Sequence, residues 1–332
     1  MKRWIKWTAG GAMLLGVIVA ATAASGLYLA EQRRNRYIDI KPRPVAYTTD
    51  AQTIERGRYL YASRGCTDCH GAQGTGREFV NDGKGTRIAG PNITSAGVVG
   101  RYQPEDWNSV IRHGVKPNGR PVMVMPSEDY NRFTNDDLNA LVSYIRQLPP
   151  QESAQQAVVD LPRPAWVLYG LGVIPDAAAR IDHQLAPSRP VPAGVTLANG
   201  QYVANMCIGC HGADLSGGKI PGGPPDWPAA SDIRPGAHST DSALARYPNA
   251  ASFVAMLRTG KRPDGTPIQV MPFESLGQLS DVDAQALYLY LNAPAGSVKQ
   301  EVGSANPAPP AQGTKSSANT VPSGAGGLKL PG

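Results

Sequence analysis

The four cysteines of this 332-residue chain fall in two clusters of one pattern, Cys66-Thr-Asp-Cys69-His70 and Cys207-Ile-Gly-Cys210-His211. No cysteine is left over, and two of the five histidines directly follow a cluster's second cysteine. Residues three apart project from the same side of a helical turn, so each cluster brings two thiols together beside an imidazole. Any fold of this chain must therefore accommodate two equivalent thiol–imidazole sites.

This pattern is typical of covalent attachment of a c-type haem. Each thiol can add to one of the two vinyl groups of the porphyrin, and the adjacent histidine then lies under the iron. A zinc site built from both pairs would need ligand pairs much farther apart than the common spacing of about 15–20 residues. A thioredoxin-like redox pair belongs in a βαβ pattern that is not visible here, and plain disulfides give the histidines no role. We expect two c-type haems, held by Cys66, Cys69, Cys207 and Cys210, with His70 and His211 as iron ligands.

The sequence around the clusters also repeats. Arg112–Pro126 matches Arg258–Pro272 at a constant offset of 146 positions. A Gly-x-Tyr triplet precedes each cluster, at residues 57–59 and 200–202. Self-similarity of this kind indicates a duplicated structural unit. The chain is therefore expected to contain two modules, at residues 50–150 and 191–294.

The repeat selects a second axial ligand for each iron. Met125 corresponds to Met271, and each is followed by proline in a Gly/Pro-rich segment typical of an irregular loop. Met123 has no methionine counterpart. We expect Met125 and Met271 to ligate the irons from the side opposite the histidines. Ordinary core methionines are the alternative, and His113, whose counterpart is not histidine, is a rival ligand.

The periodicity predicts an all-α fold, in which each module runs as helix, haem turn, long loop, helix, methionine loop and helix. Apolar residues recur at helical spacing over 138–148 and 287–291, and middle helices are predicted at 104–113 and 248–259. Residues 151–190 form a proline-rich linker around an apolar stretch, 166–174, that is too short to span a bilayer. This stretch can pack between the modules, on a partner or on a membrane surface. Residues 295–332, rich in Ala, Pro, Gly and Ser, are expected to be disordered.

The N-terminal segment, residues 1–36, is expected to be a membrane anchor. Its stretch from Trp7 to Ala30 carries no charge, and as a helix it measures about 36 Å against a bilayer core of about 30 Å. The alternative is a signal peptide with small residues at 21–23, although the apolar stretch continues past that site. Basic residues flank both ends, so their distribution does not set the orientation. Most of the formal charge of +6 lies in this segment, which argues against binding to nucleic acid.

On these motifs, and on the string Gly90-Pro91-Asn92-Ile93-Thr94, the chain resembles membrane-anchored di-haem c-type cytochromes. It also resembles the cytochrome c subunits of bacterial membrane-bound alcohol and gluconate dehydrogenases, and the likeness covers residues 50–294. The resemblance implies two tandem class I-like cytochrome c domains in the periplasm, behind an N-terminal transmembrane helix in the inner membrane. It further implies that a proline carbonyl accepts the ring N–H of each ligating histidine. By position this is Pro91 for His70, and Pro224 or Pro225 for His211.

Histidine and methionine together fill both axial positions, so the expected function is one-electron transfer. The resemblance implies a dehydrogenase or a quinol-oxidising protein as donor, and a terminal oxidase or a soluble cytochrome as acceptor. One alternative is a haem subunit of a membrane-bound dehydrogenase complex. Another is a di-haem oxidoreductase with its own substrate site for peroxide or a small sulfur compound. That chemistry needs an open iron, and the matching methionines argue against it.

Overall fold

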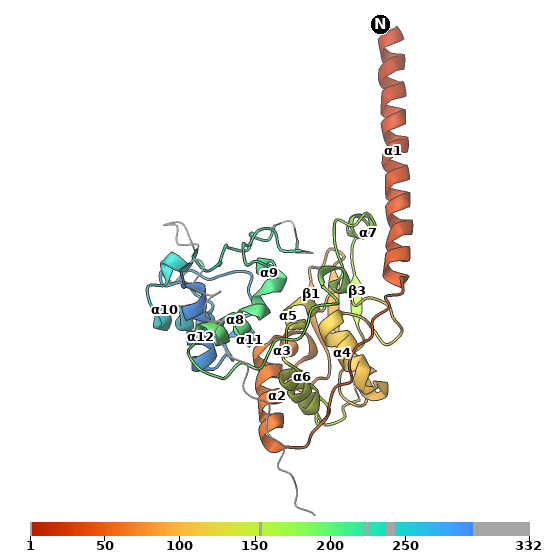
Figure 1. Ribbon diagram of the computed structural model, residues 1–332. Helices are drawn as coiled ribbons and strands as arrows, with labels where there is room; N and C mark the ends of the chain where they lie inside the picture. The colour runs from red at the N-terminus through yellow and green to blue at the C-terminus, as the bar shows by residue number, and fades with distance from the viewer. Residues whose placement is uncertain (1, 153–154, 222, 225, 237–242, 295–332) are drawn as a thin grey trace, which may run out of the picture.

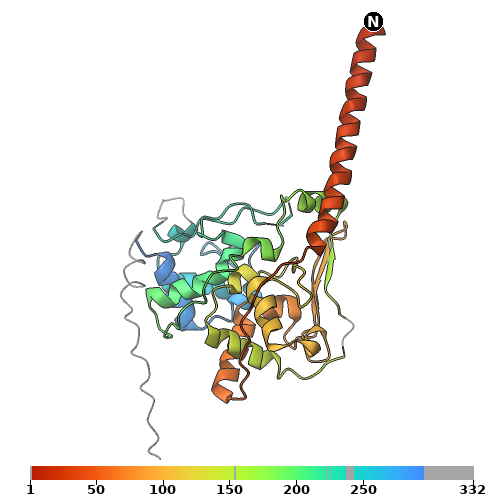
Figure 2. The ribbon, with the colours of Figure 1, turned by 45° about the vertical axis from the view of Figure 1, so that its right-hand side comes forward.

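The computed structural model describes residues 2–152, 155–221, 223–224, 226–236 and 243–294 (Figure 1). Helix α1 (Lys2–Asn35) rises alone from a body in which the two modules lie side by side, as Figures 1 and 2 both show. The tail predicted to be disordered, 295–332, lies outside the described residues.

Both modules contain the predicted helices. The first module holds α2 (Ala51–Ser63), α3 (Cys66–His70), η1 (Val98–Arg101), α4 (Pro104–His113), α5 (Ser127–Tyr130) and α6 (Asn135–Ile145). The second holds α8 (Leu197–Ala204), η3 (Asn205–Cys207), α9 (Ile208–His211), η4 (Ala243–Arg246), α10 (Ala250–Thr259), α11 (Phe273–Leu276) and α12 (Asp281–Leu291). Between them lie α7 (Arg163–Gly170) and η2 (Ala177–Arg180). The repeat in sequence is therefore a repeat in structure.

The first and last helices of each module cross at a glycine. A Cβ on Gly57 of α2 would lie 2.0 Å from the carbonyl oxygen of Ala140 in α6. A Cβ on Gly200 of α8 would lie 2.0 Å from the carbonyl oxygen of Ala286 in α12. No side chain fits at that distance, so only glycine permits the crossing. The glycine of each Gly-x-Tyr triplet is thus explained by helix packing.

The expectation of an all-α fold is wrong in one part. β1 (Arg77–Asn81), β2 (Arg87–Gly90) and β3 (Val158–Asp160) form an antiparallel sheet in the order β1-β2-β3. The strands are short, and β1 is only partly buried along its length. They therefore lack the clean alternation of apolar and polar residues by which a strand is recognised. The third strand comes from the segment interpreted as a linker.

Helix α7 packs against the C-terminal part of α1. A Cβ on Gly170 would lie 1.8 Å from the carbonyl oxygen of Gly26, so the two backbones touch. The guanidinium of Arg36, just after α1, makes two hydrogen bonds to the carboxylate of Asp176, at 2.5 and 2.7 Å. The apolar stretch 166–174 thus lies beside the N-terminal helix. Within the described residues, Trp7–Asn35 is the one helix long and apolar enough to cross a membrane, and an 18-residue window within it has a mean hydropathy of 2.0.

The two modules meet through reciprocal contacts. Tyr59 of the first module donates its hydroxyl to the Asp283 carboxylate of the second, at 2.6 Å. Tyr202 of the second donates to Asp137 of the first, also at 2.6 Å. Both tyrosines belong to the Gly-x-Tyr triplets, and both aspartates lie in the first turn of the last helix of their module. The contact therefore relates the modules by an approximate two-fold axis.

A buried ion pair strengthens this interface. Arg64 and Asp283 are 4% and 5% exposed, and their side chains approach to 2.9 Å. Asn199 donates a further hydrogen bond to Asp283, at 3.1 Å. Burial opposes ionisation of this carboxyl, but Arg64 and the hydrogen bonds from Tyr59 and Asn199 hold its pKa below the ordinary value. Asp283 is therefore a carboxylate in the folded protein.

Candidate haem-binding sites

The first cysteine cluster forms a single helical turn. Gly65 adopts a left-handed conformation, with φ of 84°, and α3 follows directly from Cys66 to His70. Cys66 and Cys69 are free thiols, not joined in a disulfide. Burial raises the pKa of each thiol to about 12, so both are neutral. The turn thus presents two unbridged thiols, as covalent attachment to two vinyl groups requires.

His70 is held in the state that an iron ligand needs. Its Nδ1 lies 2.9 Å from the carbonyl oxygen of Pro91, which accepts the ring N–H. Burial lowers the pKa of the imidazole, so the ring is neutral. With Nδ1 carrying the proton, the lone pair of Nε2 is free for a metal. The acceptor implied for His70 by the family resemblance is confirmed.

Strand β2 brings Pro91 under the histidine. The strand ends at Gly90, where a Cβ would lie 2.2 Å from the carbonyl oxygen of Cys69. Two residues after Pro91, the Ile93 amide donates to the Gly74 carbonyl at 2.7 Å, which fixes the strand end against the loop after the haem turn. The string Gly90–Thr94 is therefore the segment that delivers the proximal carbonyl.

The second site has the same arrangement but a different acceptor. The Nδ1 of His211 lies 2.8 Å from the carbonyl oxygen of Ser231. The expectation of Pro224 or Pro225 is wrong; Pro225 itself lies outside the described residues. Burial again lowers the pKa of the imidazole and keeps the ring neutral. A backbone carbonyl serves equally well from any residue, so nothing in this role requires proline.

The sequence did contain a signal for Ser231. Two residues later, Ile233 donates its amide to the carbonyl of Leu215 at 3.0 Å, as Ile93 does to Gly74 in the first module. Leu215 has a φ of 64°, matching the positive φ of Gly74, although it is not glycine. The residue two positions before the shared isoleucine therefore marks the acceptor in each module.

The second pair of thiols resembles the first. Cys207 is half-buried and Cys210 is exposed, and neither forms a disulfide. Burial raises the pKa of the Cys207 thiol to about 12, and it raises that of Cys210 as well. We call the two helical turns at Cys66–His70 and Cys207–His211 the attachment turns. Each combines two free neutral thiols with a neutral imidazole, and these residues fit a covalently bound haem.

The two candidate methionines lie in equivalent places. Met125 is half-buried against the same core cluster as Cys66, and Met271 against the same cluster as Cys207. Each is followed by proline and a one-turn helix, α5 or α11. Each methionine loop therefore packs on the same apolar core as the cysteine cluster of its own module.

His113, the rival ligand, has another partner. Its Nδ1 lies 3.2 Å from the Nδ1 of His183, in the segment between the modules. Burial, together with the neighbouring His183 and Arg112, lowers the pKa of His113 to about 4. His113 is therefore neutral near pH 7 and faces a second imidazole.

Each attachment turn also contacts the other module. In the first, the Asp68 carboxylate accepts a hydrogen bond from the Ser275 hydroxyl of α11, at 2.8 Å. In the second, the Gly209 amide donates to the Asp129 carboxylate of α5, at 2.6 Å. Positions 129 and 275 are equivalent in the repeat, as are 68 and 209. Both turns therefore lie against the helix that follows the methionine loop of the other module.

Two turns with paired thiols and a carbonyl-bound neutral imidazole define a c-type cytochrome. The family described as "Cytochrome C oxidase, cbb3-type, subunit III" matches residues 52–145 and 196–291, once in each module. The match covers more than half of the chain, which therefore belongs to this family of cytochromes c. Membership implies covalently bound haem and a role in electron transfer.

Curated relatives carry related names. The chain is 28% identical over 172 residues to the fructose dehydrogenase cytochrome subunit of Gluconobacter japonicus, and this match covers 49% of this chain and 35% of the relative. It is 32% identical over 117 residues to the cbb3-type cytochrome c oxidase subunit CcoP of Helicobacter pylori strain 52, covering 35% of each. It is 25% identical over 313 residues to the cytochrome c subunit of the quinone alcohol dehydrogenase of Gluconacetobacter polyoxogenes, covering 84% of this chain and 63% of the relative. The chain thus spans between about one third and two thirds of these relatives.

Proposed function

We propose that this chain is a membrane-anchored di-haem electron carrier with His/Met ligation at both irons. The haems are bound through Cys66, Cys69, Cys207 and Cys210, and the iron ligands are His70 with Met125 and His211 with Met271. The observation that carries this proposal is the matched state of the two imidazoles. Each donates Nδ1–H to a carbonyl, at 2.9 and 2.8 Å, and leaves Nε2 free.

A haem iron with histidine and methionine ligands supplies reversible one-electron redox chemistry at a raised potential. The protein residues hold and tune this group. The cysteines would attach the porphyrin, the two carbonyls orient the imidazoles and make them better donors, and the methionines would supply the second protein ligand of each iron. An iron held by two protein ligands would offer no open site to a substrate. Carriage of electrons, rather than turnover of a substrate by this chain, follows from that ligand set.

The helix α1 supports the second part of the proposal, which is location. We place α1 in a bacterial inner membrane and both modules in the periplasm, where c-type haem is attached in proteins that this chain resembles. Donors and acceptors then include membrane-bound dehydrogenases, quinol-oxidising proteins, terminal oxidases and soluble cytochromes. The relatives, which are named as subunits of dehydrogenases and of an oxidase, support redox partners of this kind.

A second candidate function is that of a fixed subunit in a dehydrogenase complex. The relatives named as cytochrome subunits of fructose and alcohol dehydrogenases favour it. Purification of the tagged full-length protein from native membranes in mild detergent distinguishes the two candidates. A dehydrogenase chain in constant ratio to the cytochrome indicates a fixed subunit, whereas a cytochrome that purifies alone indicates a mobile or independently anchored carrier.

Haem counting tests the main proposal. The denatured full-length holoprotein should have a mass that exceeds the polypeptide by two haems, and the Cys66→Ala, Cys69→Ala variant should exceed it by one. Low-spin optical spectra with a Met–iron charge-transfer band should accompany both haems. A colourless protein, or a mass excess of fewer than two haems in the unaltered chain, would contradict the proposal.

A further inference from the structure

An apolar surface lies at the foot of α1, on α7 and the turn that follows it. Leu168, Leu171 and Val173 are 41%, 45% and 65% exposed. No charged residue occurs between Pro164 and Pro175. Isolated exposed aliphatic residues are common, but a charge-free run with three of them on one short segment indicates a surface that is covered in the working protein.

The depth of this surface relative to α1 follows from a backbone contact. Gly170 of α7 touches Gly26 of α1, where a Cβ would lie 1.8 Å from the Gly26 carbonyl oxygen. Crossing the bilayer core takes about 20 helical residues, and the uncharged run of α1 extends from Trp7 to Ala30. Every placement of such a span within that run includes Gly26. Helix α7 therefore lies at the edge of the hydrocarbon core, next to the point where α1 leaves it.

One buried carboxylate, that of Asp176, holds α7 and the end of α1 together. Tyr169 donates its hydroxyl to the Asp176 carboxylate at 2.9 Å, and the same carboxylate binds Arg36 at the end of α1. Asp176 is fully buried. Because α7, its following turn and the end of α1 are joined in this way, the apolar surface cannot swing away from the membrane boundary.

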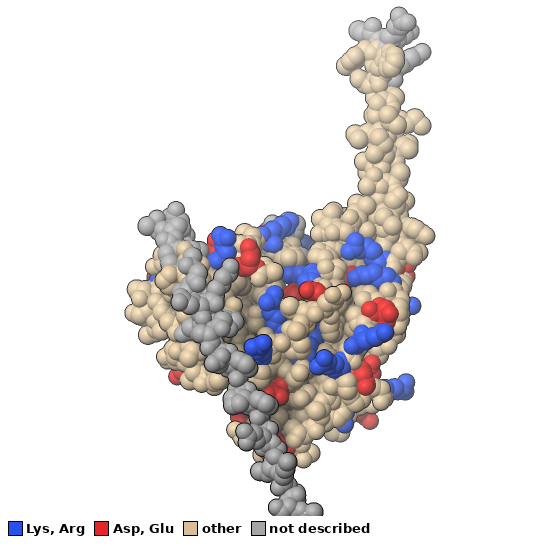
Figure 3. All heavy atoms as spheres, viewed as in Figure 1, with Lys and Arg blue, Asp and Glu red and all other residues tan. Residues whose placement is uncertain are grey.

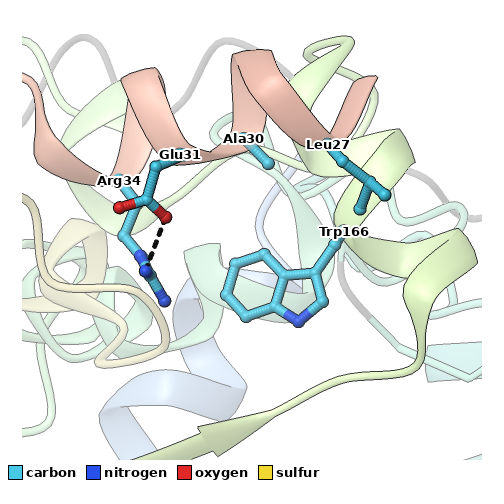
Figure 4. A pocket seen from close by; sticks show the side chains of 5 residues that line it. All are labelled: Leu27, Ala30, Glu31, Arg34 and Trp166. Atoms are coloured by element: carbon cyan, nitrogen blue, oxygen red, sulfur yellow. Dashed lines mark hydrogen bonds and ion pairs between the residues drawn. The ribbon is translucent and has the colours of Figure 1, made fainter. Parts of the chain in front are cut away.

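The side chains around the crossing follow the polarity gradient of a bilayer surface. Arg34 lies over the ring of Trp166, at 5.6 Å from its centroid, and Arg33 over that of Tyr169, at 5.4 Å. Tryptophan and tyrosine are enriched at membrane–water interfaces, and arginine can act as an anchor there. Figure 4 shows a hollow between the two helices, with Leu27 and Ala30 on its apolar side and the Arg34–Glu31 ion pair on its polar side. Figure 3 shows acidic and basic side chains on the body and none on the described surface of α1 beyond it.

From this placement we infer that α7 and its following turn insert into the lipid interface beside α1, with Leu168, Leu171 and Val173 in contact with lipid. The inference rests on the proposed membrane anchor and deepens it. A single helix alone leaves the attached modules free to tilt. A second contact at the lipid surface sets which face of the modules is turned to the membrane. The competing occupant of this surface is an apolar partner protein.

Spin labels in the full-length holoprotein test the inference. The four native cysteines are bonded to haem in the proposed holoprotein, so a cysteine introduced by Leu168→Cys, Leu171→Cys or Val173→Cys is the single reactive thiol. Each nitroxide-labelled variant is placed in nanodiscs of phosphatidylethanolamine and phosphatidylglycerol. Its collision rates with oxygen, which concentrates in lipid, and with a water-soluble nickel chelate are then measured. Haem content and optical spectra confirm that each variant has folded.

Two matched controls calibrate the measurement. Leu15→Cys, at a position 63% exposed in the middle of α1, reports lipid, and Val282→Cys, 40% exposed at the start of α12, reports water. We expect the three labels near α7 to collide with nickel several-fold less often than the label at position 282, and with oxygen nearly as often as the label at position 15. Nickel collisions equal to those at position 282 overturn the inference and leave the surface to a partner protein, as does protection from both reagents. An aqueous label at position 15 contradicts the anchor itself, which separates the two failures.

Discussion

At the scale of single residues, the two modules reach the same geometry with different side chains. Pro91 and Ser231 each offer a backbone carbonyl to the histidine of a cysteine cluster, at 2.9 and 2.8 Å. Gly74 and Leu215 share a positive φ. What the site requires is the backbone position, so the side chain can vary where only a carbonyl or a turn is used. In the proposed haem sites it cannot vary at the cysteines, histidines and methionines, because each of these acts through its own side chain.

Removal of either methionine tests this distinction. Met125→Ala or Met271→Ala should leave both haems attached, because the cysteine sulfurs remain bonded to them, and should remove one ligand from one iron. We expect the Met–iron charge-transfer band to fall by about half and the potential of that haem to drop, since methionine raises it. Optical spectra and a potentiometric titration measure both effects. Met123→Ala, a methionine two residues from Met125, is the control and should change neither; unchanged spectra in both test variants would show that the ligand assignment is wrong.

The proximal carbonyl provides the opposite test. Ser231→Ala keeps the backbone oxygen that accepts from His211, so we expect an unchanged spectrum and a change in unfolding free energy within about 0.5 kcal/mol. His211→Ala removes the ligand itself and should abolish the normal low-spin spectrum of the second haem. Thermal unfolding and optical spectra of the two variants make the comparison. A spectral change in Ser231→Ala would mean that its hydroxyl takes part.

At the scale of elements, the glycine crossings determine how each module closes. Gly57→Ala or Gly200→Ala would place a Cβ 2.0 Å from a carbonyl oxygen of the last helix, so the helices must separate. We expect a net loss of about 1–3 kcal/mol in unfolding free energy, because a Cβ this close to a backbone oxygen costs more than the gain of about 1 kcal/mol in helix propensity. Thermal unfolding of the holoprotein measures it. Gly194→Ala, where the nearest side-chain atom would be 3.6 Å away, is the control and should be nearly neutral; equal stability of all three variants would contradict the crossing.

The elements that periodicity could predict are those whose stability is local. The helix at 104–113 and the capped helix that begins after Thr134 follow from their own apolar spacing and N-cap residues. The sheet could not be predicted, because its central strand, Arg87–Gly90, pairs with Arg77–Asn81 on one side and with a strand about 70 residues later on the other. The position of α7 could not be predicted either. Its apolar residues indicate a covered surface, but the sequence does not indicate which element covers it.

The residues of the site also divide into those marked by a local motif and those that depend on distant contacts. The thiols, the histidines and the acceptor Pro91 could be named in advance, because a motif or a family string marks each of them. Ser231 was missed, since the string around Pro91 is replaced by one that shares only the later isoleucine. The contacts of Asp68 with Ser275 and of Asp129 with Gly209 join distant parts of the chain. Nothing local in the sequence predicts them.

At the scale of the whole molecule, equivalent contacts from both modules join them at one interface. Tyr59 and Tyr202 exchange hydrogen bonds with the last helices, and each attachment turn contacts the other module. This packing places the two attachment turns at one shared interface. The proposed relay between two haems requires such a fixed relation, because a mobile pair would exchange electrons only when it met by chance.

The buried ion pair is the part of this interface most sensitive to substitution. Asp283→Asn leaves Arg64 buried without its counter-ion, and we expect a loss of about 3–5 kcal/mol in unfolding free energy. Asp281→Asn breaks an ion pair with Arg258 in which the aspartate is 76% exposed, so it should cost less than about 1 kcal/mol. Denaturant unfolding of both holoproteins compares two aspartates in one helix. Equal losses of unfolding free energy in the two variants would show that the buried ion pair of Arg64 and Asp283 adds no more stability than an exposed one.

The same carboxylate makes the interface sensitive to acid. The pKa of Asp283 is lowered in the folded protein, so its contribution to stability is complete above the ordinary value of about 3.9 and is lost as the pH falls through the lowered folded value. Protonated Asp283, like asparagine, then leaves Arg64 buried without a counter-ion. We therefore expect the difference in unfolding free energy between the unaltered protein and Asp283→Asn to be constant near neutral pH and to shrink toward zero as the pH falls from about 5 to below the folded pKa of Asp283. Denaturant titrations of the two holoproteins across that range measure it, with Asp281→Asn as the control whose small difference changes little. A difference that persists undiminished at the acid end would mean that the ion pair does not stabilise the interface through the charge of Asp283.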